Sequence, residues 1–274
     1  MNNDDDAHKG QRAVQSVEVG GRLLLALADQ PGPMSLKDLA SAADLPPSRA
    51  HPYLVSYGKL GLVSQDAVSG RYALGPAALQ IGLACLFQSD PLKAANPVAE
   101  ELAAQSGQAV ALSVWGNFGP TVVRMIEARQ PLHVAMRAGT VMAMFGTATG
   151  RAFVGALPRE RILQAMSGPF GTSGSQARPG KAEIDAEVAS AQAELQAHGV
   201  ARAMGRPIPG VNAFSAPVRD HEGQPVLVVT ALGHQDHFPA AWNSPMAAAV
   251  RGAAQEISGR LGFRVRAEPS KRGG

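Results

Sequence analysis

The first apolar residues of the chain recur at the spacing of an α-helix. They share one face from residue 14 to residue 28, and a cluster of helix breakers, QPGP at 30–33, follows them. Ser35 then stands three residues before Asp38, which is typical of a helix N-cap with an acid in the first turn. We therefore predict one helix up to the breakers and a second, short helix that ends near Ala43.

A third helix and a hairpin are predicted directly afterwards. The helix is expected to start at Ser48 as its N-cap and to end at Gly61, with Ala50, Leu54 and Leu60 facing inward. Two short strands, 62–65 and 71–74, flank a polar turn. Helix, helix, turn, helix and hairpin within about 60 residues is the order of a winged helix-turn-helix, whose third helix enters the major groove of DNA.

The rest of the chain predicts a linker helix and a larger mixed domain. The apolar helix at 76–87 has Leu79, Leu83 and Leu86 on one side, and the last helix carries an apolar stripe that should cover one face of a sheet. The last two strands are joined by the polar turn DHEG at 220–223. The predicted strands are 109–115, 121–126, 132–136, 211–219 and 225–233, and the predicted helices are 98–105, 147–157, 159–166, 184–198 and 244–261.

These elements predict an α+β protein with two domains of unequal size. The boundaries are a winged helix-turn-helix at 13–75, mostly α with a two-stranded wing, a linker helix at 76–90 and a C-terminal α/β domain at 91–264. Residues 1–12 and 265–274 are polar without periodicity, and we expect them to be disordered tails.

Composition and charge narrow the class of protein. The single cysteine, Cys85, cannot form an internal disulfide, the N-terminus lacks the regions of a signal peptide, and no apolar run approaches the roughly 20 residues of a membrane span. We therefore expect a cytoplasmic protein without a membrane segment. The net charge is only +3, and seven basic against five acidic side chains between residues 7 and 86 are a weak electrostatic footprint for a DNA binder. The expectation of DNA binding thus rests on the local pattern.

No catalytic motif accompanies this pattern. The chain has no G-x-S-x-G elbow, no P-loop and no dinucleotide fingerprint. His234 and His237 have a metal-like H-x-x-H spacing, but two histidines without a third ligand nearby do not make a closed zinc site. Cys85 lies on an apolar helix stripe, so we predict a buried packing thiol rather than a nucleophile. We expect no enzyme activity, no metal and no cofactor.

Five segments, taken in order, resemble the IclR family of transcriptional regulators. The resemblance covers about residues 14–263 and implies a C-terminal sensor domain with a curved antiparallel, GAF-like sheet that carries effector binding and oligomerisation. It also implies homodimers or homotetramers that bind palindromic operators in double-stranded DNA and respond to small carboxylates or aromatic metabolites. The segments are QSVEVGGRLLLAL (15–27), LKDLASAADLPPSRAH (36–51), GLVSQDAVSGRYALGPAALQIG (61–82), GTATGRAF (146–153) and PGVNAFSAPVRDHEGQPVLVVTALG (209–233).

The helix-turn-helix carries the candidate DNA contacts. Arg49, in the first turns of the third helix, can pair bidentately with guanine, and Arg71 in the wing could contact the DNA backbone or minor groove. Each could instead be an ordinary solvated side chain, and Tyr53 could lean into the core. The full set of candidates is Ser35, Lys37, Ser48, Arg49, His51, Tyr53 and Arg71.

Pro52 departs from the family pattern, which usually has a basic residue at this position. Proline lacks an N–H group and clashes with the preceding turn, at a cost of ~3 kcal/mol in a helix interior. With Ser48 as the N-cap, Pro52 would be the fourth helical residue, at the edge of the zone where N–H groups are unpaired anyway. We predict a kinked or late-starting recognition helix and, because the basic group is lost, weaker or less specific operator binding.

The resemblance places an effector pocket at GTATG (146–150) and on the last two strands. Thr147 and Thr149 would lie at a helix N-terminus, where free N–H groups suit a carboxylate, although simple helix capping explains them as well. Arg202 and Arg206 stand where family members often carry acids, which suggests an anionic ligand. The candidates are Thr147, Ala148, Thr149, Met204, Arg206, Ala213, Ser215, Thr230 and Leu232.

Two functions are therefore considered. The first is a sequence-specific DNA-binding regulator of the IclR type, controlled by a small anionic effector that is a carboxylate or an aromatic acid. The alternative is a metabolite-binding protein whose winged helix serves protein interaction or dimerisation, which the weak charge and Pro52 favour. A DNA affinity that falls steeply with salt would distinguish the first from the second.

Overall fold

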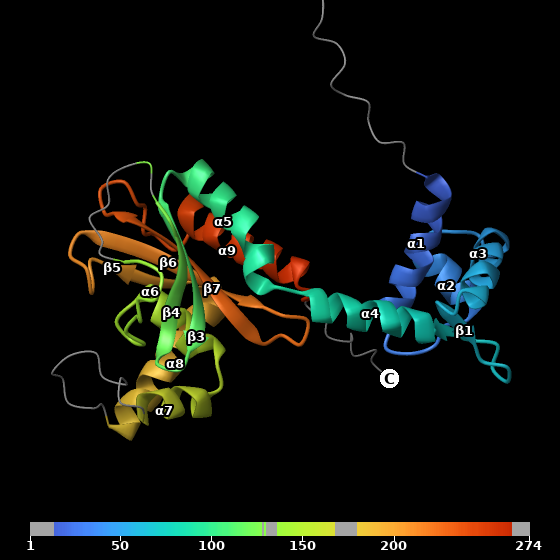
Figure 1. The fold of residues 1–274 in the computed structure, drawn as a ribbon, viewed down its shortest axis with the longest axis horizontal. Helices are drawn as coiled ribbons and strands as arrows, with labels where there is room; N and C mark the ends of the chain where they lie inside the picture. Colours follow the sequence, from blue (N-terminus) through green and yellow to red (C-terminus); the bar gives the residue numbers. More distant parts are fainter. Residues whose placement is uncertain (1–13, 128, 130–135, 168–179, 265–274) are drawn as a thin grey trace, which may run out of the picture. The chain divides into compact units, whose positions relative to one another are not determined.

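The computed structural model describes residues 14–127, 129, 136–167 and 180–264 (Figure 1). The chain divides into two compact units, Met1–Ser89 and Asp90–Gly274. The first contains a two-stranded sheet and the second a five-stranded sheet. Each unit has its own apolar core.

The N-terminal unit has the predicted order of a winged helix-turn-helix. Its two strands pair antiparallel with Val63 opposite Leu74, and a bridge between Met34 and Tyr72 attaches this wing to the segment before the second helix. The elements are α1 (Gln15–Ala28), α2 (Leu36–Ala42), α3 (Pro47–Lys59), β1 (Val63–Gln65), β2 (Tyr72–Leu74) and α4 (Pro76–Gln88).

Close contact between α1 and α3 organises the core of this unit. A Cβ atom at Gly20 would lie 2.0 Å from the hydroxyl of Tyr57, so a larger residue here would require the Tyr57 side chain to move. Burial raises the pKa of Tyr57, and the charge of Tyr53 raises it further. The predicted N-cap is confirmed, since the Ser35 hydroxyl accepts a hydrogen bond from the Asp38 amide and donates one to its carboxylate.

The start of the third helix differs from the prediction. The N-cap is Pro46, and Pro47 is the first helical residue, a position at which a missing N–H group costs nothing. The prediction of a late-starting helix at Ser48 is therefore wrong, and Pro52 lies more than one turn inside a helix that continues to Lys59. Ala50 and Leu54 are buried as predicted, whereas Leu60 is 66% exposed because it is the C-cap, beyond the inward face.

Helix α4 is apolar but contains no buried residue within the chain. Leu79, Leu83 and Leu86 are all exposed, and so is Cys85, which contradicts the prediction of a buried thiol. The reason is that α4 meets its own unit through its first turn, where the Ala77 amide donates to the Gly61 carbonyl at 3.0 Å. The spacing of the apolar residues predicted a stripe along α4, but it did not say whether other residues of the same chain would pack on that stripe.

The C-terminal unit is built on a five-stranded antiparallel sheet with the order β4-β3-β7-β6-β5, as the fold prediction required. The strand predicted at 132–136 lies outside the described residues apart from Met136, which is in no strand. The strands are β3 (Ala109–Gly116), β4 (Gly119–Ile126), β5 (Ala201–Met204), β6 (Val211–Arg219) and β7 (Pro225–His234).

Helices cover both faces of this sheet. Figure 1 shows α5 (Pro91–Ser106) beside α9 (Pro245–Arg260), and both pack on one face through a core that includes Leu112, Phe214 and Val229. The predicted stripe of α9 is confirmed, because its members Met246, Val250, Ala254, Ile257 and Leu261 are all buried. The second face packs against a separate core formed with α6 (Ala148–Ala156), α7 (Arg159–Ser167) and α8 (Lys181–His198).

Helices α6 and α8 approach each other closely at Gly155. A Cβ atom at this position would lie 2.6 Å from the Ala191 carbonyl oxygen and 2.8 Å from the Leu195 side chain. The carbonyl belongs to the helix backbone, so it cannot move aside without shifting α8. This contact therefore fixes the spacing of the two helices.

Gly155→Ala should lower the free energy of unfolding of the C-terminal unit by about 1–3 kcal/mol, because overpacking outweighs the better helix propensity of alanine. Denaturant unfolding followed by circular dichroism measures the change. Gly252→Ala in α9 is the matched control, since nothing lies within 4 Å of a Cβ atom there, and it should be neutral or stabilising by about 0.5–1 kcal/mol. Equal effects of the two substitutions would contradict the close contact.

Candidate functional site

The predicted DNA-contacting side chains of α2 and α3 lie mostly at the surface. Ser48, Arg49 and His51 are exposed on the first turns of α3, and Lys37 is exposed on α2. Ser35 is only partly exposed, and its hydroxyl is occupied in capping α2. Ser48, Arg49 and His51 share one short stretch of α3, as a groove-reading surface requires.

Tyr53 and Arg71 are partly committed to the fold. Tyr53 is half-buried against the core of its unit, and its ring lies 3.1 Å from a Cβ atom built at Gly20. Arg71 is exposed, but its guanidinium donates a hydrogen bond to the Pro33 carbonyl at 3.2 Å. This bond holds the wing to the loop before α2 and leaves other N–H groups of Arg71 for a phosphate.

The wing also carries an acid at its turn. The carboxylate of Asp66 accepts hydrogen bonds from the backbone and side chain of Ser69, both at 2.7 Å, and the backbone bond is the main reason why its pKa is lowered. Asp66 therefore keeps its negative charge to lower pH than an ordinary aspartate. That negative charge repels DNA phosphates close to the wing and further reduces the weak positive charge of the unit.

A pocket opens on the sheet face that α6 covers. Seven of the nine predicted effector residues line it, namely Thr147, Ala148, Thr149, Arg206, Ala213, Thr230 and Leu232. Met204 does not; it is 54% exposed at the end of β5. Ser215 does not line the pocket either, because it lies fully buried behind Thr230.

Much of the apolar lining was not predicted. Ala203 and Val211 could have been found from strand alternation, since Ala203 pairs with Ala213 across β5 and β6. The remaining residues come from segments without a repeating pattern and gave no signal in the sequence. The unpredicted lining residues are Met136, Met142, Ala203, Pro207, Ile208 and Val211.

The polar end of the pocket is the start of helix α6. Thr147 caps this helix, because its hydroxyl accepts the Gly150 amide at 2.9 Å and donates to the Ala143 carbonyl at 2.7 Å. The amides of Ala148 and Thr149 belong to the first turn, where N–H groups have no partner within a helix and the helix dipole is positive. The Thr149 hydroxyl contacts that of Thr230 at 2.9 Å.

The two arginines near β5 have different surroundings. Arg202 stacks over the ring of Trp242, 4.0 Å from its centre, and donates to the Ala240 carbonyl at 2.8 Å. Arg202 is therefore not part of the pocket. The expectation that both arginines mark an anionic ligand is wrong for Arg202 and stays a prediction for Arg206. Arg206 lines the pocket and is exposed, so its guanidinium can reach a ligand from the solvent side.

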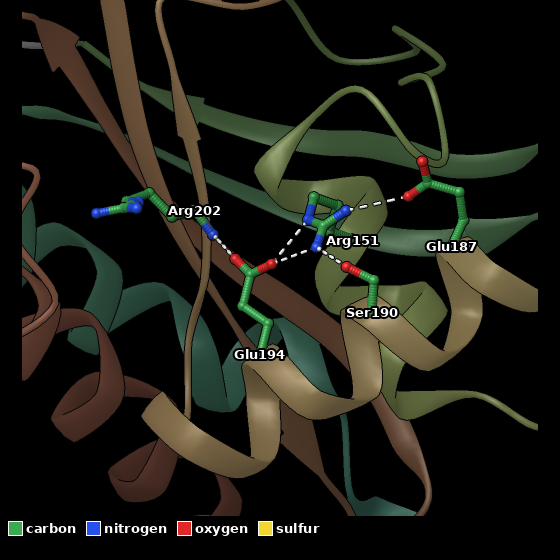
Figure 2. A network of polar contacts seen from close by, with 5 residues as sticks. All are labelled: Arg151, Glu187, Ser190, Glu194 and Arg202. Carbon is green, nitrogen blue, oxygen red and sulfur yellow. Dashed lines mark hydrogen bonds and ion pairs between the residues drawn. The ribbon is translucent and has the colours of Figure 1, made fainter.

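A polar network fixes α6 in place (Figure 2). The Arg151 guanidinium forms an ion pair with Glu194 of α8, and its Nε donates a hydrogen bond to the same carboxylate at 2.9 Å. Its other N–H groups donate to the Glu187 carboxylate and to the Ser190 hydroxyl, each at 3.2 Å. The second carboxylate oxygen of Glu194 accepts the backbone amide of Arg202 at 2.6 Å. One carboxylate thus joins α8 to α6 and β5, two of the elements that line the pocket.

The histidines of the H-x-x-H segment do not converge. The Nδ1 atom of His234 faces the Asp236 carboxylate at 3.4 Å, and the ring centres of His234 and His237 lie 6.4 Å apart. Within the described ranges, no three side chains of His, Cys, Asp or Glu are grouped to hold a metal ion. The same ranges contain no helix that is both long and apolar enough to cross a membrane.

Comparisons with known proteins agree with this architecture. One family model, the IclR helix-turn-helix domain, matches residues 16–67, and a second, the bacterial transcriptional regulator IclR C-terminal domain, matches residues 84–259. The HTH-type transcriptional regulator KipR of Bacillus subtilis is 28% identical over 84% of this chain and 90% of its own length. The glycerol operon regulatory protein of Streptomyces coelicolor is 27% identical over 92% and 98%. The crystal structure of Pseudomonas aeruginosa HmgR has a TM-score of 0.81 and 32% identity, covering 91% of this chain and 99% of that one.

Glu194→Ala should destabilise the C-terminal unit by about 2–4 kcal/mol, because the partly buried Arg151 guanidinium loses one of its two carboxylate partners and the Arg202 amide loses its acceptor. Thermal unfolding measures the loss. The matched control is Glu256→Ala, which removes an exposed pair with Arg260 on α9 and should cost less than about 0.5 kcal/mol. A change below 0.5 kcal/mol for Glu194→Ala would show that the network does not hold α6.

Proposed function

This chain belongs to the IclR family of DNA-binding transcriptional regulators, and we propose that a small anionic molecule, a carboxylate or an aromatic acid, controls it from the C-terminal pocket. The supporting observation is the combination of a polar end and an apolar body in one pocket. The first amides of α6, the Thr149 and Thr230 hydroxyls and Arg206 suit a carboxylate. Met142, Ile208 and Leu232 suit the apolar remainder of the ligand.

We further propose that Arg49 is the main base-reading residue on α3. It is exposed in the first turn, where a recognition helix meets base edges, and its planar guanidinium can bind guanine with two hydrogen bonds. Lys37, Ser48 and His51 would add phosphate and base contacts, and Arg71 would contact the DNA backbone. Ser35 and Tyr53 would contribute mainly by holding the helices.

The proposed assembly is a homodimer or homotetramer that places pairs of winged helices on a palindromic operator in the cytoplasm. Effector control requires that the ligand bind two arrangements of the assembly with different affinity. This role is regulatory rather than catalytic, which agrees with the names of the relatives. The alternative, in which the winged helix serves protein interaction or dimerisation, rests on Pro52 and on the acid at the wing turn.

Arg49→Ala should weaken binding to operator DNA by about tenfold or more, since a bidentate arginine–guanine pair contributes roughly 1–3 kcal/mol. Fluorescence anisotropy with DNA from the promoter region of the gene, in a salt series, measures the affinity. Lys181→Ala, an exposed cation on α8, is the control and should leave the affinity unchanged. If the wild-type chain shows no salt-dependent affinity, the alternative function is favoured.

Arg206→Ala should weaken the binding of carboxylates by about tenfold, because a hydrogen bond to a charged group contributes about 1.5–3 kcal/mol. A panel of aliphatic and aromatic acids, titrated while the melting temperature is followed, identifies acids that bind the wild type. Arg161→Ala, an exposed arginine on α7, should bind them as the wild type does. The absence of a shift with every acid would count against an anionic effector.

A further inference from the structure

The middle of the exposed side of helix α3 is apolar. Pro52 and Val55 are both exposed, Val55 to 45%, and they lie three residues apart, so they form an apolar pair on one side of the helix. The far side carries Ala50 and Leu54, which are buried in the core of the N-terminal unit. When a recognition helix lies in the major groove, the side away from its core faces the bases. The apolar pair is therefore placed to meet base edges.

Polar side chains surround the apolar pair. Ser48 precedes Pro52 by one turn and Lys59 follows Val55 by one turn, and both are exposed on the same side of α3. Arg49 and His51 are exposed along the two margins of this side. The surface thus has polar groups at its ends and edges, and an apolar centre that none of the proposed base and phosphate contacts uses.

The apolar pair cannot form hydrogen bonds through its side chains. The proline ring takes away the backbone N–H group of Pro52, and the Val55 side chain ends in two methyl groups. A donor or acceptor of a base pressed against these groups would lose its water without gaining a partner, which is unfavourable. The major groove offers one apolar group, the 5-methyl group of thymine. This methyl group is the part of a base edge that fits the centre of α3.

We propose that Pro52 and Val55 select thymine in the operator by contact with its 5-methyl group. Cytosine at the same place lacks the methyl group and presents an amino donor, for which neither side chain has an acceptor. This inference rests on the proposed placement of α3 in the major groove with Arg49 as a base-reading residue. Pro52 then contributes to base selectivity, although it adds no positive charge.

Fluorescence anisotropy on the full-length chain tests the proposal with two versions of the promoter duplex, one made with thymine and the other with uracil. Uracil pairs with adenine as thymine does but lacks the methyl group, so the operator need not be located beforehand. The wild type should bind the uracil duplex about threefold to fivefold more weakly for each methyl group that the protein contacts, as burial of one such group implies. If neither duplex shows a salt-dependent affinity, the proposed DNA reading fails together with this inference. If both duplexes bind equally, only the inference fails.

Serine substitutions assign the lost affinity to the apolar pair. Pro52→Ser and Val55→Ser should each lower the thymine-to-uracil affinity ratio at least twofold, whereas Val55→Thr, which keeps one methyl group in place, should retain most of it. Leu60→Ser is the matched control, because Leu60 is also apolar and 66% exposed but follows the last residue of α3. It should leave the ratio unchanged. A wild-type ratio in both Pro52→Ser and Val55→Ser would show that other residues read the methyl groups, which would overturn the proposal.

Pro52→Arg separates selectivity from charge. An added cation should strengthen binding to both duplexes and steepen the dependence of log affinity on log salt by about 0.9, as one more phosphate contact does. The thymine-to-uracil ratio should nevertheless fall at least twofold, because the methyl contact is lost. If the ratio stays at the wild-type value, Pro52 does not select thymine. Melting temperatures without DNA verify that each variant folds.

Discussion

The first turn of α6 is held against a backbone that leaves no room for a side chain. At Gly150 a Cβ atom would lie 2.1 Å from the Ala143 carbonyl oxygen and 2.4 Å from that of Met144. The next residue, Arg151, ties the same turn to α8 through Glu194. Because backbone packing on one side and an ion pair on the other fix this turn, its amides and the Thr149 hydroxyl are in position before any ligand arrives. Such preorganisation reduces the entropy that binding has to offset.

Most of the fold could be predicted from the sequence because its elements are amphipathic. The apolar residues of α9 repeat at helical spacing, and β6 and β7 are apolar runs that flank a polar turn. The structure has all three elements within a residue or two of the predicted bounds. The start of α3 was mispredicted because Ser48 is a good capping residue, whereas the adjacent Pro46 and Pro47 set the helix start by backbone geometry. The burial of α4 was mispredicted because its apolar residues occupy most of its circumference, and a pattern within one helix does not say what it packs against.

The candidate pocket could be predicted where the resemblance to the IclR family carries over to it. The resemblance at the start of α6 and on the last two strands supplied Thr147, Thr149, Ala213 and Thr230, all of which line the pocket. Met136, Met142 and Ile208 could not be predicted, because irregular segments have no period from which a side chain's direction follows. The role of Arg202 was mispredicted because its charge suggested a ligand contact. Its side chain instead stacks on Trp242, which lies 40 residues further along the chain, and local sequence does not reveal such a contact.

The pairing of β3 with β7 determines when the sheet can form during synthesis. The central pair, β3 and β7, joins Ala109 to Leu232, so the middle of the sheet cannot close until almost the whole C-terminal unit has left the ribosome. The winged helix-turn-helix, by contrast, is formed from contacts within Met1–Ser89. During synthesis the winged helix-turn-helix can fold while β3 still lacks its partner β7. A nascent chain interrupted in between would carry a folded winged helix-turn-helix without the five-stranded sheet.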